Sequence, residues 1–79
     1  MTEIILVFRS SGAVIAGERK LLDAGVDVRV MAAPKGSGCG ICLSINAAHL
    51  GKAKLLLGND IQSIYRSDEN GKELLPWVP

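Results

Sequence analysis

The order of apolar and polar residues along the chain predicts four short strands. Residues 3–8 (EIILVF) are a short apolar run rich in strand-forming side chains, and both faces of this strand are apolar. In residues 26–31 (VDVRVM) the three valines lie on one face and Asp27 and Arg29 on the other, as in a half-buried strand. In residues 41–46 (ICLSIN) the face of Ile41, Leu43 and Ile45 likewise alternates with the face of Cys42, Ser44 and Asn46. Residues 61–67 (IQSIYRS) predict the fourth strand.

A helix is expected between the first two strands. Residues 13–24 carry helix-forming side chains, and either Ser10 or Ser11 is a good N-cap for them. Gly25 is expected in the left-handed conformation that ends many helices. The chain should therefore pass from the first strand to the second through a helix.

A second helix is expected after the third strand. Asn46 can cap a helix over residues 47–57, and Gly58 should end it. After the fourth strand, Asn-Gly at 70–71 predicts a tight turn. The tail that follows, residues 72–79, contains two prolines, which prevent it from forming a central strand.

This order of elements is that of the ferredoxin-like βαββαβ fold, in the α+β class. It predicts a four-stranded antiparallel sheet in the order 4-1-3-2, with two helices on one face. The chain is short enough to form a single domain over residues 1–79. In this topology the loop at 34–40, the start of the first helix and the loop at 58–60 should lie at one end of the sheet.

The first strand suggests self-association. If Ile4, Leu6 and Phe8 point toward the helices, Ile5 and Val7 lie on the opposite face, which a single copy of this fold does not cover. An exposed apolar surface of this kind is typical of an interface. A homo-oligomer formed through the open face of the sheet is therefore expected.

The charge pattern argues against a nucleic-acid-binding protein. The formal net charge is +1, and basic and acidic residues are mixed along the whole chain. The sequence shows no apolar run of about 18 residues and no pattern of a secretory signal. We therefore expect a cytoplasmic protein with neither nucleic acid nor membrane as a partner.

The two cysteines of the chain lie in one glycine-rich stretch, PKGSGCGICLSI. In a reducing cytoplasm a C-x-x-C spacing is more typical of a redox, metal or carrier site than of a structural disulfide. Cys39 lies in the loop and should be accessible and reactive as a thiolate, whereas Cys42 is a strand residue that can act as a resolving partner. The residues expected to support the thiolate are Ser10, Ser11, Lys35, Gly38 and Gly40.

Other interpretations of the cysteines stay open. Both can be ordinary structural residues, because cysteine is often buried. A structural zinc site is disfavoured, because it needs four ligands and His49 is expected at the opposite end of the preceding strand. Two-coordinate Cu(I) fits a pair of thiols, although the pattern of copper chaperones places C-x-x-C before the first helix, where this chain has RSSG.

Three further residues have to be weighed. Glu18 interrupts the apolar stripe of the first helix that contains Leu21 and Leu22, and it should reach solvent, pair with a lysine or lie near the site. His49 is expected to be a surface or packed residue without a catalytic role. Trp77, between two prolines, is expected to cover an edge of the core.

Taken with these residues, the chain resembles the selenium/sulfur (Se/S) carrier protein-like family of small bacterial and archaeal proteins. The resemblance covers most of the chain, including GERKLLDAGVDVRVMAAP and GSGCGICLSI, and its most specific part is S-G-C-G followed by an apolar strand. It implies that Cys39, flanked by Gly38 and Gly40, is the reactive cysteine. It also implies that Pro34 opens the loop and that Glu18 is the acid of the family's first helix.

Cys42 departs from the family pattern, because we expect a small residue there in many members. The resemblance implies a carrier that holds selenium or sulfur on Cys39 and delivers it to another protein. Its partners are then a donor and an acceptor protein, and it needs no metal, no cofactor beyond the bound chalcogen and no enzymatic turnover. The competing classes are a thiol-disulfide redox switch, a Cu(I)-binding module and an interaction subunit with incidental thiols.

Overall fold

The computed structural model describes residues 2–34 and 40–77 of the 79-residue chain. The strands are β1 (Glu3–Phe8), β2 (Val28–Ala32), β3 (Ile41–Asn46), β4 (Ile61–Asp68) and β5 (Gly71–Leu75), and the α-helices are α1 (Ser11–Asp23) and α2 (Leu50–Leu57). Two short 3-10 helices, η1 (Ala47–His49) and η2 (Gly58–Asp60), flank α2. Within the described ranges, no helix is long and apolar enough to cross a membrane.

The sheet has five antiparallel strands in the order β2-β3-β1-β4-β5. The expected α+β class and the expected neighbours of the first four strands are confirmed, but the expected four-stranded ferredoxin-like sheet is wrong in its number of strands. The difference arises at residues 70–71, where Gly71 adopts a φ of 116° and Asp68 accepts a hydrogen bond from the Asn70 amide at 2.8 Å. This tight turn folds residues 71–75 back as an edge strand, a position that the prolines after it permit.

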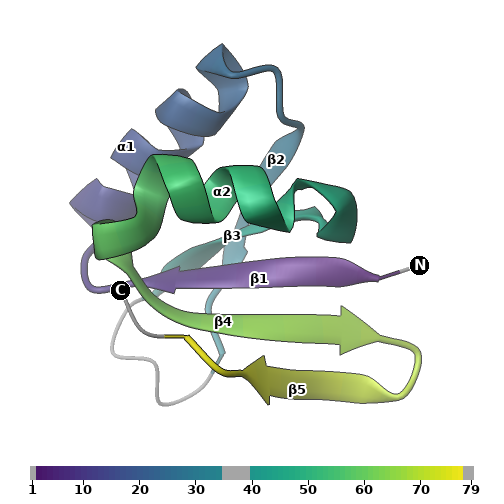
Figure 1. Cartoon of the computed structure of the whole chain (residues 1–79). Helices are drawn as coiled ribbons and strands as arrows, with labels where there is room; N and C mark the ends of the chain where they lie inside the picture. Colours follow the sequence, from purple (N-terminus) through teal and green to yellow (C-terminus); the bar gives the residue numbers. More distant parts are fainter. Residues whose placement is uncertain (1, 35–39, 78–79) are drawn as a thin grey trace.

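Both α-helices cover one face of the sheet (Figure 1). Ile4, Leu6 and Phe8 of β1 point to this face and are at most 2% exposed. They pack in the main core with buried residues of both helices and of the neighbouring strands, among them Val14, Leu21, Leu43, Ala53, Leu57 and Ile64. α1 approaches the sheet closely at Gly17, where a Cβ atom would lie 3.3 Å from Cζ of Phe8.

The first helix begins two residues before the expected range. Ser10 is the N-cap, and its hydroxyl accepts a hydrogen bond from the Ala13 amide at 3.1 Å. Gly25 follows the helix with a φ of 80°, as expected. Leu22 does not belong to the buried stripe, because it is 53% exposed, and Glu18 is half-buried.

The second face of the sheet is not open in the way that we expected. Ile5 and Val7 are each only 1% exposed in the single chain, and they pack with Cys42. Partly buried side chains of neighbouring segments, Met31, Ala33 and Tyr65, pack against this second cluster. The expectation that β1 has an uncovered apolar face is therefore wrong, and so is the reason we gave for an oligomer through that face.

Candidate functional site

The register of the strands brings the ends of several segments together at one end of the sheet. Phe8, the last residue of β1, is paired with Ile61, the first residue of β4. Ala32, the last residue of β2, is paired with Ile41, the first residue of β3. The two ends of the cysteine loop, the start of α1 and η2 therefore lie at this end, which confirms the expected arrangement. We call it the cysteine-loop end.

Cys42 is the second residue of β3 and is completely buried. It faces away from Leu43, as the alternation predicts, because Leu43 lies in the main core and Cys42 in the second cluster. Its Sγ donates a hydrogen bond to the Ala32 carbonyl at 3.6 Å, and Met31 is its cross-strand neighbour. A fully buried thiol has no direct route to a partner protein.

A backbone hydrogen bond joins the two ends of the loop that carries the other cysteine. The Ala33 amide donates to the Gly40 carbonyl at 3.1 Å, which closes the hairpin between β2 and β3. Gly40 is exposed, and among residues 2–34 and 40–77 a Cβ atom added to it would meet nothing within 4 Å, so none of these residues requires glycine here. Cys39, Gly38 and Lys35 lie outside the described residues, and their expected roles stay predictions.

Ser10 and Ser11 lie at the cysteine-loop end, and both are exposed. The Ser10 hydroxyl caps α1, and the Ser10 carbonyl accepts a hydrogen bond from the Val14 amide at 3.2 Å. Ser10 thus acts through the helix, because it fixes where the helix begins. The N-terminus of α1 carries a partial positive charge, which favours an anion placed near it.

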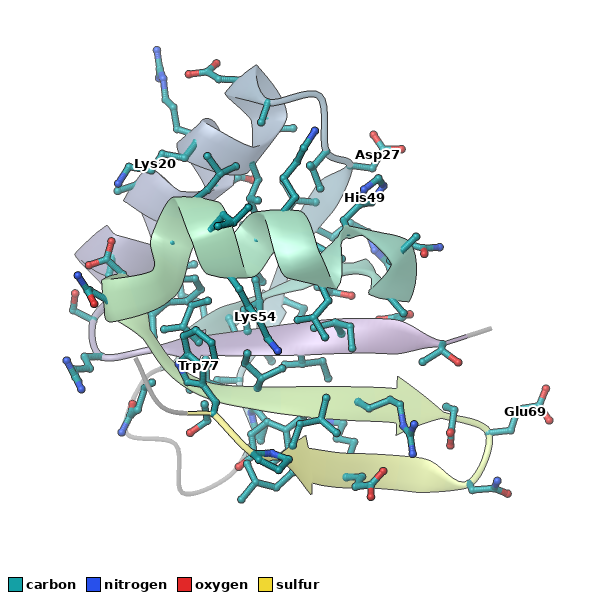
Figure 2. The ribbon with its side chains drawn as sticks, in the orientation of Figure 1. Lys20, Asp27, His49, Lys54, Glu69 and Trp77 are labelled. Carbon is teal, nitrogen blue, oxygen red and sulfur yellow. The ribbon has the colours of Figure 1, made fainter. Side chains whose placement is uncertain are left out.

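His49 lies at the other end of the molecule, as expected. It belongs to η1, which follows Asn46, and Asn46 is paired with Glu3 at the start of β1. Figure 2 shows His49 far from Trp77, which marks the cysteine-loop end. Among residues 2–34 and 40–77, no group of three or more His, Cys, Asp or Glu side chains is arranged to hold a metal ion.

The structure shows a polar cluster at the His49 end that the sequence pattern did not predict. The Ser44 hydroxyl donates to Glu3 Oε2 at 2.6 Å, and Arg29 Nη2 donates to Glu3 Oε1 at 3.1 Å. Ser44 is 3% exposed, and Glu3 satisfies its hydroxyl. The three residues line a cavity of about 420 Å³ together with Asp27 and Asn46. The register of the strands puts Arg29 and Ser44 opposite each other and brings Glu3 beside them.

Trp77 covers an edge of the core at the cysteine-loop end, as expected. Its Nε1 donates to the Ile61 carbonyl at 3.0 Å, and its ring packs against the main core. The ammonium of Lys54, on α2, lies 5.6 Å from the centre of the ring, within the range of a cation–π contact (Figure 2). The tail after β5 is thus held against α2 and β4.

Comparison with known proteins identifies the family. Residues 3–66 match the model of the family described as "Putative Se/S carrier protein-like". The matched range includes Cys39 and Cys42 and ends within β4, before β5 and Trp77. No curated protein and no solved structure matches the chain. Because the match spans more than half of the chain, this protein belongs to the Se/S carrier protein-like family.

Proposed function

We propose that the protein carries selenium or sulfur on Cys39 and passes it from a donor protein to an acceptor protein. The observation that carries this proposal is the family match over residues 3–66, which contain both cysteines. The burial of Cys42 supports the choice of Cys39, because an accessible thiol is needed for exchange between proteins.

The proposed loading step is a sulfur transfer between thiols. The Cys39 thiolate attacks the outer sulfur of a persulfide on the donor, R–S–SH, and the R–S⁻ thiolate leaves. Cys39 then holds the sulfur as Cys39–S–SH. In delivery, a thiolate of the acceptor attacks that outer sulfur, and the Cys39 thiolate is released. Selenium in place of the outer sulfur follows the same two steps, and neither step consumes an oxidant or a reductant.

The start of α1 is the feature of the described residues that we expect to help the thiolate. Ser10 and Ser11 place the positive end of the helix at the cysteine-loop end, which is also the end at which β3 begins. Lys35 and the amides of Gly38 and Gly40 are proposed to add to this effect. Together they would keep a larger share of Cys39 ionised at neutral pH.

A redox switch is the main competing function. In that case Cys42 would attack an intermediate on Cys39 and form an internal disulfide, so both sulfurs would be required. The burial of Cys42 argues against a direct role in exchange with other proteins, because an exchanging thiol has to be accessible to them. A Cu(I) site would need both thiolates as well.

Intact-mass spectrometry separates these functions. The wild type, Cys39→Ser and Cys42→Ser are treated with glutathione persulfide, or with selenite and glutathione, and measured without reductant. We expect a gain of about 32 Da for sulfur or about 80 Da for selenium on the wild type and on Cys42→Ser, and no gain on Cys39→Ser. Cys42→Ser is a mild change, because the hydroxyl can also donate to the Ala32 carbonyl.

Two results would overturn the carrier function. One is equal loss of loading in both variants. The other is a wild type that only loses about 2 Da, the mass change of an internal disulfide. Either result would make Cys39 and Cys42 a redox pair. Stoichiometric copper on the wild type, lost in both variants, would instead select the Cu(I) module.

A further inference from the structure

The two outer strands of the sheet differ in how their open edges are protected. β5 carries Lys72 and Glu73 and is followed by Pro76, and charges and proline at an edge discourage pairing with another strand. β2 has the sequence VRVMA, in which Arg29 alone is charged, and Arg29 is already paired with Glu3. The edge of β2 is therefore the less protected of the two.

The backbone of β2 presents hydrogen-bonding groups at this edge. The Ala33 amide donates to the Gly40 carbonyl, so these residues form a hydrogen-bonded pair across the two strands. In an antiparallel ladder such pairs alternate, which directs the backbone of Met31 and Arg29 toward β3. The N–H and C=O groups of Val28 and Val30 then point away from the sheet. An extended strand is the partner that satisfies this row of alternating donors and acceptors.

Apolar side chains flank the same edge. Val30 belongs to the face of the sheet that carries the helices, yet it is 43% exposed. On α1, Ile15 is 61% and Leu22 is 53% exposed, and their seven-residue spacing puts them on one stripe of the helix. Leu22 and Val28 line one cavity, so the stripe faces β2. Exposed apolar side chains of the helix and of the strand thus lie on the same face of the sheet, beside the edge of β2.

The stripe on α1 is complementary to itself. Glu18 and Arg19 lie between Ile15 and Leu22 on the same side of the helix. When two copies of α1 meet antiparallel, the spacing that puts Ile15 opposite Leu22 of the second copy also puts Glu18 opposite Arg19 of the second copy. Each pair then occurs twice, with opposite charges facing at the centre. A surface that matches its own copy in this way fits the symmetry of a dimer.

We infer that β2 pairs antiparallel with β2 of a second copy of this chain, which joins two sheets into one. The pairing is centred on Val30, so that Val28 lies opposite Ala32 of the second copy and every paired residue belongs to the strand. The α1 stripes meet above the joined sheet and bury Ile15 and Leu22. This interface lies along a sheet edge, not on the open face, and it does not depend on the function of Cys39.

Sedimentation velocity over a range of protein concentrations tests the dimer. We expect the wild type to sediment at about twice the 8.3 kDa of one chain at tens of micromolar. Val30→Lys should raise the dissociation constant at least about tenfold, because it places a charge on the two-fold axis. Leu74→Lys is the matched control, since Leu74 is 61% exposed on the other outer strand, and it should leave the constant unchanged.

A charge reversal tests the register of the helices. Glu18→Arg should weaken the dimer about tenfold, because it faces like charges at the centre of the stripe, and the double variant Glu18→Arg with Arg19→Glu should restore it. Circular dichroism of each variant checks that the fold is kept. A monomeric wild type would overturn the inference and leave the edge for a strand of another protein. A dimer unaffected by Val30→Lys, or one broken by Leu74→Lys, would overturn it as well.

Discussion

The two faces of the sheet bury the same kind of side chain in different ways. Ile4 and Ile5 are neighbours on β1, and they are 2% and 1% exposed. Ile4 packs in the main core under both helices, whereas Ile5 packs in a small cluster with Val7 and Cys42. On the second face, side chains of the sheet and its adjoining segment, among them Tyr65 and Met31, pack against this cluster.

The difference shows that equal burial does not mean equal protection. The main core is covered by two helices, whose removal would require breaking many contacts at once. The second cluster is covered by fewer side chains than the main core, and these are themselves partly exposed, so its burial is more easily lost. Cys42 lies in the second cluster, and the access of reagents to its thiol therefore depends on this thinner cover.

The largest expected effect separates the two isoleucines. Ile4→Ala should lower the free energy of unfolding by about 3–4 kcal/mol and Ile5→Ala by about 2–3 kcal/mol, because a cavity in the larger core loses more contacts. Urea denaturation of both variants at one protein concentration measures the two losses. A larger loss for Ile5→Ala would reverse the ranking of the two faces.

The second expected effect concerns the protection of Cys42. In a Cys39→Ser background, alkylation of Cys42 by iodoacetamide should be at least about 100-fold slower in the folded protein than in urea, because the thiol reacts only after local opening. Tyr65→Ala should speed this reaction in the folded protein, since the Tyr65 ring packs against the cluster. Tyr65→Phe, which keeps the ring, is the control. Rapid labelling of folded Cys42 would show that the second cluster does not shield it.

A smaller effect is expected where the tail covers the main core. Trp77→Phe should cost about 1 kcal/mol, because it removes the hydrogen bond from Nε1 to the Ile61 carbonyl and keeps most of the ring. Thermal unfolding measured by circular dichroism gives the loss. Lys54→Met, which removes the charge near the ring, should cost less. An unchanged stability in Trp77→Phe would mean that the tail does not hold the core edge.

The smallest effect is expected at the polar end of the second face. Arg29→Met should change the stability by no more than about 0.5 kcal/mol, since the Arg29 side chain is 74% exposed and its pairing with Glu3 is screened by salt. Glu3→Ala should cost more, because it also leaves the buried Ser44 hydroxyl without its acceptor. The free energy of unfolding, measured at low and at high salt, distinguishes the loss of the ion pair from the loss of the hydrogen bond to Ser44. A similar cost for both variants would give Arg29 a greater role than its exposure suggests.

Much of the fold could be predicted from local patterns. The bounds of β1 and β3 agree with the expected strands at 3–8 and 41–46, because continuous apolar runs and strict alternation depend on neighbouring residues only. The capping of α1 by Ser10 and the left-handed Gly25 follow from the chemistry of single side chains. The fifth strand was missed because its few residues, ending at prolines, have no strong pattern of their own.

Part of the site could be predicted as well. The alternation of ICLSIN put Cys42 and Leu43 on opposite faces, and the sheet topology brought the two ends of the cysteine loop, the start of α1 and η2 to one end. The polar cluster of Glu3, Arg29 and Ser44 could not be predicted, because it joins three strands through their register. The assignment of Cys39 as the carrier stays a prediction.

The sequence by itself determined where strands and helices form, how they are capped and which family the chain resembles, since these depend on residue type and spacing. Only the tertiary structure decided how completely the second face is buried. Ile5, Val7 and Cys42 lie within a sheet whose open side looked uncovered from the order of elements, and the side chains that pack against them come from other segments of the chain, among them β2 and β4. The burial of a face depends on what the whole chain brings over it, and a local pattern does not contain that information.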